Sequence, residues 1–128
     1  MCFTIHDSNR NILTAKKDIT CYKVIRLYGN QLRGVYQQSY HYKVDKTLSV
    51  RGWEDETSKI IRAQLGSIHK GFHSHSAQRP VKRMWMCGCK VYKCTIPKGA
   101  LYLYNPIKQQ YVSNKLILVE EMDKNKIR

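Results

Sequence analysis

The densest group of chemically active side chains lies in one short segment, where Gly71 leads into the sequence Phe-His-Ser-His. His73 and Ser74 offer an imidazole and a hydroxyl, and both groups can donate a hydrogen bond to a phosphate oxygen. A glycine lets the backbone approach a ligand closely, and a turn leaves side chains free to face it. We therefore predict a turn with His73 and Ser74 as ligand-binding residues. The alternative is a loop in which a histidine caps a neighbouring strand.

Four further residues are candidates for the same site. Arg26 lies on an expected early strand and supplies a fixed cation suited to two-pronged phosphate contact. Tyr40 and Tyr42 share one face of an expected strand and could stack on a base. Lys98 stands in the tight turn Ile-Pro-Lys-Gly, where its ammonium could contact a phosphate. Tyrosines on strands commonly pack in the core, so a purely structural role for Tyr40 and Tyr42 is the alternative to stacking on a base.

The cysteines and histidines have the ligand types of a zinc site but not its usual spacing. Cys87, Cys89 and Cys94 follow His73 and His75 in the chain. The Cys-x-Cys spacing is less typical than Cys-x-x-Cys, no second cysteine pair follows, and Cys94 falls on the apolar face of its expected strand. We therefore predict no structural zinc, no other metal and no cofactor.

Catalytic signatures are weak in this sequence. Carboxylates that could act in pairs occur at Glu54–Glu56 and Glu120–Glu121, and no phosphate-binding or dinucleotide-binding glycine motif is present. A phosphodiesterase with two His-x-Ser/Thr motifs would need a second copy of the one at residues 73–76. No local pattern supports a Cys-His nucleophile. We therefore predict no catalytic residues and favour binding over catalysis.

The charge distribution points to an anionic partner. The 128 residues contain 23 Lys and Arg against 9 Asp and Glu, which gives a formal net charge of +14. No acid occurs from position 57 to 119, so this stretch contains no carboxylate that could pair with its bases. These bases are Lys59, Arg62, Lys70, Arg79, Lys82, Arg83, Lys90, Lys93, Lys98, Lys108 and Lys115. A solvated basic surface is the alternative to a phosphate-binding one.

The elements that must position these residues form a single domain over residues 1–128. We expect strands at 21–28, 35–43, 47–51, 90–96 and 100–104, with one or two more at 111–119. Helices are expected at 58–65 and, broken by Pro80, at 77–86. Residues 1–20 should form a loosely structured entry segment, and 123–128 a frayed tail. The sum is an α+β fold, a small mainly antiparallel sheet of about six or seven short strands with one or two helices.

Six short motifs in the same order resemble a family of small uncharacterised proteins of bacteriophages and mobile elements in gut bacteria. They are Met1-Cys-Phe3, Cys21-Tyr-Lys-Val24, Tyr40-His-Tyr42, Gly71-Phe-His-Ser74, Cys94-Thr-Ile-Pro-Lys-Gly99 with Tyr102, and Tyr111-Val-Ser-Asn114. The family has no assigned activity, so the resemblance implies a viral or mobile-element setting. The order of basic, serine-bearing and glutamate-bearing segments is also similar to ADP-ribosyltransferase domains. The expected Glu-x-Glu is missing, because Glu120 and Glu121 are adjacent.

These observations predict a non-enzymatic protein that binds a phosphate-bearing nucleotide. In the setting that the resemblance implies, it would be a phage protein that sequesters a nucleotide signal of host antiviral defence. The alternatives are a nucleic-acid-binding module and an enzyme of the ADP-ribosyltransferase or phosphodiesterase type. An odd number of cysteines without a signal peptide or a long apolar run predicts a soluble, cytoplasmic protein that does not contact membranes. The oligomeric state is left open.

Overall fold

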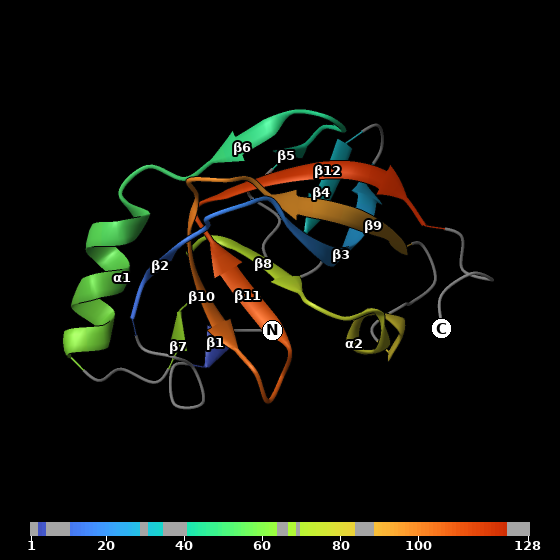
Figure 1. Cartoon of the computed structure of the whole chain (residues 1–128). Coiled ribbons are helices and arrows are strands. Elements are labelled where there is room, and N and C mark those ends of the chain that lie inside the picture. Colours follow the sequence, from blue (N-terminus) through green and yellow to red (C-terminus); the bar gives the residue numbers. More distant parts are fainter. Residues whose placement is uncertain are drawn as a thin grey trace.

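The computed structural model describes residues 3–4, 11–28, 31–34, 41–63, 67–68, 70–83 and 89–122. These residues form one large, mainly antiparallel sheet with two helices, so the α+β class expected from the sequence is confirmed. Figure 1 shows α1 and α2 toward opposite ends of the sheet. No helix among the described residues is long and apolar enough to cross a membrane.

Eight strands follow one another across the large sheet in the order β2-β10-β11-β8-β3-β9-β12-β6. Strand β4 pairs with β3 and with β5, and a separate pair is formed by β1 and β7. The bounds are β1 Phe3–Thr4, β2 Leu13–Thr14, β3 Ile19–Tyr28, β4 Gln31–Gly34, β5 His41–Tyr42, β6 Thr47–Ser49, β7 Ser67–Ile68, β8 Phe72–His75, β9 Cys89–Ile96, β10 Leu101–Asn105, β11 Gln110–Ser113 and β12 Lys115–Glu121.

Strand β3 lies in the middle of the sheet, and its alternating side chains pack on both faces. Cys21, Lys23 and Ile25 share one face, which we call the Lys23 face, while Tyr22 and Val24 lie on the opposite face. The long pairing of β3 with β9 runs from Ile19↔Ile96 to Arg26↔Cys89. Since partners in register share a face, this pairing fixes which side chains of the neighbouring strands reach the Lys23 face.

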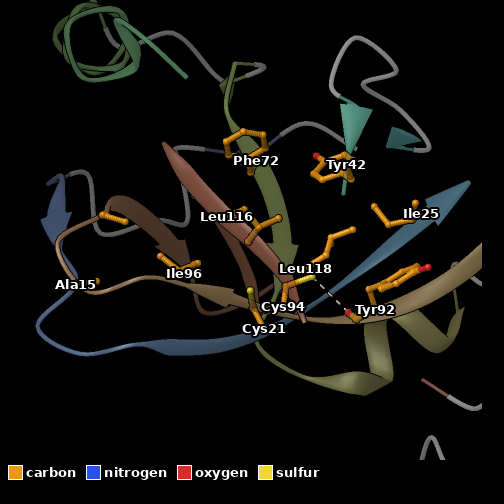
Figure 2. Packing of buried hydrophobic residues seen from close by; sticks show 11 residues of the cluster. Ala15, Cys21, Ile25, Tyr42, Phe72, Tyr92, Cys94, Ile96, Leu116 and Leu118 are labelled. Carbon is orange, nitrogen blue, oxygen red and sulfur yellow. Dashed lines mark hydrogen bonds between the residues drawn. The ribbon is translucent and has the colours of Figure 1, made fainter. Parts of the chain in front are cut away.

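The Lys23 face carries the largest apolar core (Figure 2). Tyr42 of β5 packs over this face, and its ring meets the Phe72 ring edge-on at a centroid distance of 6.0 Å. The backbone beyond β5 reaches β12 through the parallel bridge between Val44 and Leu118. The buried members are Ala15, Cys21, Ile25, Tyr42, Phe72, Tyr92, Cys94, Ile96, Ala100, Leu116 and Leu118.

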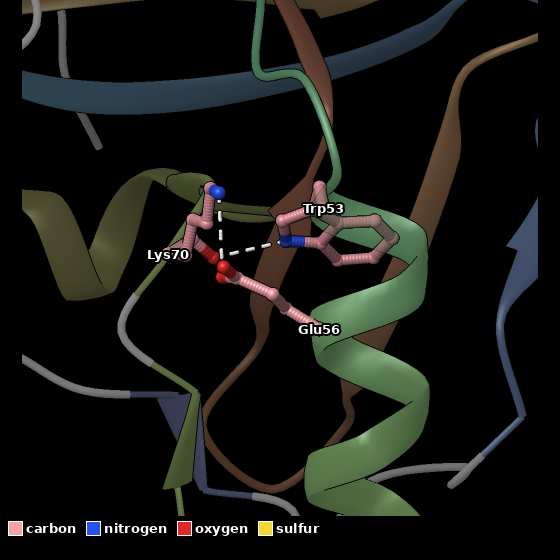
Figure 3. Close-up of polar contacts among 3 residues, drawn as sticks. All are labelled: Trp53, Glu56 and Lys70. Carbon is pink, nitrogen blue, oxygen red and sulfur yellow. Dashed lines mark hydrogen bonds and ion pairs between the residues drawn. The ribbon is translucent and has the colours of Figure 1, made fainter.

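Helix α1, Trp53–Arg62, covers one part of the opposite face. Three acids in its first turn and two bases in its last turn interact favourably with the helix dipole and stabilise the helix. Buried Trp53 packs with Phe3, Ile68, Leu103 and Val112, a group that we call the Trp53 cluster. Figure 3 shows the indole Nε1 donating to the Lys70 carbonyl oxygen at 2.9 Å, beside an ion pair between Lys70 and Glu56 at 3.3 Å.

Helix α2, Gln78–Arg83, covers the other part of that face. Its buried Val81 packs with Val24, Cys89 and Val91. Pro80 lies in the first turn of this helix, where a missing N–H breaks no helical hydrogen bond. The expected break at Pro80 is therefore absent from the described part of the helix, and residues 84–86 lie outside the described ranges.

Several sequence expectations need correction. The described part of the chain forms twelve strands rather than six or seven, because the short strands β1, β2, β4, β7 and β8 were not expected. The segment 1–20, expected to be loose, contains strands β1, β2 and the start of β3, and Phe3 is fully buried. Helix α1 starts at Trp53 rather than at 58, because Trp53 and Thr57 bury one side of it. Of the expected strand 35–43, residues 35–40 lie outside the described ranges, as does the tail 123–128.

Candidate functional site

Lys23 is a half-buried lysine beside the sheet's largest core. Its Nζ donates a hydrogen bond to the His73 carbonyl oxygen and lies 5.6 Å from the centroid of the Tyr42 ring. Burial lowers the pKa of Lys23 to about 8, although the nearby sulfur atoms of Cys94 and Cys21 oppose that shift. In the part of the chain that the structure describes, no carboxylate pairs with this ammonium. Lys23 is therefore a mostly protonated cation at pH 7 that lacks a described counter-ion.

Ser74 lies beside Lys23, and its buried hydroxyl needs a hydrogen-bond partner. The pairing of Tyr22 with His75 in antiparallel strands sets Lys23 across from Ser74. Ser74 is completely buried, and its Oγ makes no hydrogen bond of ordinary geometry among the described residues, although the Cys21 sulfur lies near it. A buried hydroxyl without a hydrogen bond costs about 1–3 kcal/mol. Such a group is a marker of strain or of a ligand position.

The boundary between β3 and β8 is weakly paired, and we call it the seam. The described residues of these two strands are joined by the single register pair Tyr22↔His75, whereas β3 and β9 are in register over eight pairs. The Lys23 side chain adds one contact across the seam through the His73 carbonyl. The seam is thus the place where the sheet can open with the smallest loss of backbone hydrogen bonds.

A row of half-buried tyrosines continues from the seam across β11 and β10. Tyr111 is the register partner of Ser74, and its ring lies 4.7 Å from the Tyr104 ring and 5.8 Å from the Tyr102 ring between centroids. The Tyr104 hydroxyl and Ser76 Oγ are hydrogen-bonded at 3.0 Å. Burial and the neighbouring Tyr104 raise the pKa of Tyr111 to about 12, so its phenol stays protonated and can donate.

Lys23, Ser74, Ser76, Tyr104 and Tyr111 together form what we call the polar strip. The strip offers an ammonium, two aliphatic hydroxyls and phenol groups with aromatic faces. An ammonium and hydroxyls suit phosphate oxygens, while tyrosine faces suit a nucleobase. The five residues of the strip include no carboxylate.

His75 lies close to the strip but on the opposite face of β8. Burial, together with the charge of Lys23, lowers the pKa of His75 to about 4. The imidazole is therefore neutral at pH 7 and contributes no cation. Burial is the larger cause of this low pKa, and the positive charge of Lys23 adds to it.

Three residues predicted from the sequence meet at the seam, though not in the expected way. His73 and Ser74 lie in strand β8 rather than in a turn, because β8 is paired by β11 on one side and β3 on the other. The described contribution of His73 to Lys23 is its backbone carbonyl. Tyr42 is buried with its ring against Phe72 and Lys23, which restricts base stacking on it. Tyr40 lies outside the described residues.

The two predicted cations are not at the seam. Arg26 falls on the opposite face of β3, because it alternates with Ile25. Lys98 is exposed in the turn between β9 and β10, and its backbone N–H donates to Asp18 Oδ1 at 2.9 Å. The next residue, Gly99, has a φ of 88° and donates to the Ala15 carbonyl at 2.8 Å. These contacts place Lys98 with residues 15–18, not with Lys23.

The sequence reasoning missed Lys23 and the tyrosine row as site residues. The signal for Lys23 was its alternation with Cys21 and Ile25, which places a lysine on the buried face of a strand. For the metal site, no group of three His, Cys, Asp or Glu side chains with ligating geometry occurs in the described residues. Cys87 lies outside them, and Cys89 and Cys94 belong to different faces of β9.

Comparison of the chain with protein-family models, with curated proteins and with solved structures finds no match.

Proposed function

We propose that this protein binds a phosphate-bearing nucleotide at the polar strip without turning it over. The phosphate would contact Lys23 and Ser74, and the base would lie against Tyr104 or Tyr111. In the mobile-element setting that the sequence resemblance implies, such binding would sequester a nucleotide signal of host defence. The observation that carries the proposal is a half-buried lysine without a described carboxylate, next to a fully buried serine hydroxyl without a hydrogen bond.

The donor capacity of Lys23 supports a bound anion. An ammonium has three N–H donors, and the His73 carbonyl accepts one of them. A phosphate oxygen could accept another, and the Ser74 hydroxyl could donate to the same group. The anion would compensate a charge whose burial is now unfavourable, so binding should raise the pKa of Lys23.

The charge around the strip also favours an anionic ligand. From β8 through β11 the described residues carry exposed Arg79, Lys98 and Lys108 and no acid, while exposed Lys90 is ion-paired with Glu121 of the neighbouring strand β12 at 2.9 Å. The described acids lie at residues 18, 45, 54–56 and 120–121, outside this stretch of the chain. A surface field of one sign raises the local concentration of anions and speeds their association.

Single-stranded nucleic acid is the second candidate, and the tyrosine row favours it. Three neighbouring tyrosines could stack on successive bases, with surface lysines on the phosphates. A polymer that contacts several phosphates should lose affinity steeply as salt increases, whereas one nucleotide in the strip should show a shallower slope. The burial of Lys23 and Ser74 favours a single phosphate group over an extended backbone.

The test is native mass spectrometry of the full chain after incubation with a mixture of nucleoside mono-, di- and triphosphates, cyclic nucleotides and short single-stranded oligonucleotides. We expect one nucleotide to be retained at a defined stoichiometry. Isothermal titration calorimetry with that nucleotide should then show at least tenfold weaker binding for Lys23→Met and Ser74→Ala, since each loses a hydrogen bond to phosphate.

The matched control is Lys59→Met, which removes the same charge from the exposed side of α1. We expect the control to bind within twofold of the wild type. Equal weakening by Lys59→Met and Lys23→Met would reduce the effect to net charge and contradict the proposed position. Retention of oligonucleotides in preference to every nucleotide would instead support the second candidate.

A further inference from the structure

Two cysteines face each other across the best-paired strands of the sheet. Cys21 of β3 and Cys94 of β9 are register partners, and both side chains are 0% exposed on the Lys23 face. Figure 2 shows their side chains beside one another in the core. Directly opposed residues in antiparallel strands have Cβ atoms about 4.5–5.5 Å apart, and a disulfide needs about 3.5–4.5 Å. A small inward movement of the two strands would therefore suffice to join the sulfur atoms.

The two thiols are chemically different. The Cys94 thiol donates to the Tyr92 carbonyl oxygen at 3.5 Å, and burial with the adjacent Cys21 sulfur raises the pKa of Cys94. Burial also tends to raise the pKa of Cys21, but the neighbouring Cys94 thiol, the nearby Ser74 hydroxyl and the charge of Lys23 outweigh it and lower that pKa. Cys21 is thus the more thiolate-like of the two, and Cys94 is the protonated partner.

The seam gives a route to the Cys21 sulfur. Cys21 precedes Tyr22, the residue of β3 that pairs with β8, and Ser74 lies near its sulfur. Opening the seam would expose this sulfur while the eight register pairs between β3 and β9 keep Cys94 opposite it. A small oxidant could therefore reach Cys21 without separating the two cysteines.

We propose that Cys21 and Cys94 form a reversible cross-strand disulfide on reaction with a hydroperoxide, independently of nucleotide binding. The Cys21 thiolate attacks one peroxide oxygen, the O–O bond breaks, and the leaving oxygen departs as hydroxide or alkoxide and takes up a proton. Cys94 then attacks the resulting sulfenic acid at sulfur and releases its oxygen as water. The two cysteines are oxidised by two electrons in total, and the peroxide is reduced. An external dithiol reverses the reaction.

The experiment treats the folded full chain with hydrogen peroxide, alkylates the remaining thiols and maps tryptic peptides without reduction. We expect an intact mass lower by two hydrogens and a linked pair of peptides spanning residues 18–23 and 94–98. Dithiothreitol should restore both free thiols. In Cys94→Ser, which lacks the second thiol, a sulfenic acid at position 21 should accumulate and be trapped by dimedone.

Two further variants test the geometry. Cys89→Ser changes a buried cysteine on the other face and should leave the yield of the disulfide unchanged. Lys23→Met removes the charge beside Cys21 and should slow the reaction at least threefold at pH 7, because less thiolate is present. The proposal is overturned if the folded chain gives no link between positions 21 and 94, or if that link appears only when the chain is first unfolded in denaturant.

Discussion

The Trp53 cluster and the seam are both buried, yet they treat their polar atoms in opposite ways. In the Trp53 cluster the indole N–H is paired with the Lys70 carbonyl, and the surrounding side chains are apolar. At the seam the half-buried Lys23 ammonium has no described carboxylate partner, and the buried Ser74 hydroxyl lacks a hydrogen bond. Burial of the Trp53 cluster stabilises the fold, whereas burial of unpaired polar groups at the seam lowers the stability of the fold. That loss is understandable if the seam binds an anion that the isolated chain does not supply.

The largest expected effect comes from the Trp53 cluster. Trp53→Ala removes the largest fully buried side chain among the described residues and leaves a cavity beside Phe3, Ile68 and Val112. We expect a loss of about 3–5 kcal/mol in the free energy of unfolding, measured by urea denaturation. Nucleotide affinity of the molecules that remain folded should not change. A loss below about 1 kcal/mol would show that this cluster does not stabilise the fold as described.

Removal of the Lys23 charge at the seam should not destabilise the fold, in contrast to Trp53→Ala. Lys23 has a lower pKa in the folded chain, about 8, than in the unfolded chain, about 10.5. The unfolded state therefore binds more protons between these values, and wild-type stability should rise by about 3 kcal/mol from pH 8 to pH 10.5 relative to Lys23→Met. At pH 7 the variant should be at least as stable as the wild type. A variant less stable by more than 1 kcal/mol at pH 7 would make Lys23 an ordinary stabilising residue.

Acid should reveal the neighbouring histidine. The pKa of His75 is lowered from 6.5 in the unfolded chain to about 4 in the folded chain by burial and by Lys23. The unfolded state takes up the proton first, so stability should fall by about 3 kcal/mol as pH decreases from 6.5 to 4. The measurement is urea unfolding across this range for the wild type and for His75→Gln, whose curve should be flatter. Parallel curves would show that His75 is not the titrating group.

The smallest effects should separate Ser74 and Ser76, two serines that are two residues apart and therefore lie on the same face. Ser74→Ala removes a hydroxyl without a hydrogen bond and should raise stability by up to about 1 kcal/mol. Ser76→Ala breaks the 3.0 Å bond to the Tyr104 hydroxyl and should lower stability by roughly 0.5–1.5 kcal/mol. Thermal unfolding of both variants makes the comparison. The same sign for both would remove the distinction between paired and unpaired hydroxyls.

The elements predicted well from sequence were those with a strong local pattern. Strand β9 alternates cleanly and ends at the turn Pro-Lys-Gly, so its expected and observed bounds differ by one residue. Strand β8 was missed because four residues with two histidines carry little strand preference, and its form depends on pairing with β11 and β3. Helix α1 was placed too late because its acidic first turn was read as the segment before a helix.

The candidate site was harder to predict because its residues are brought together by the register of neighbouring strands and not by a local sequence motif. His73 and Ser74 were found because their types stand out in the sequence. Lys23 and Tyr111 were not, since a lysine on a strand is normally solvent-exposed and a tyrosine is normally core. What joins them is the order of neighbouring strands β11, β8 and β3, which are far apart along the chain. No spacing within a single segment encodes that order.

The central claim is that half-buried Lys23 at the seam binds an anion, and the protonation of its ammonium tests this directly. The 13C chemical shift of the Lys23 side chain, assigned by loss of its signal in Lys23→Met, should titrate with a pKa of about 8 in the free chain. Saturation with the nucleotide identified by mass spectrometry should raise that pKa by at least one unit, because a bound phosphate favours the charged form. A pKa that stays the same when the nucleotide is bound would contradict the account.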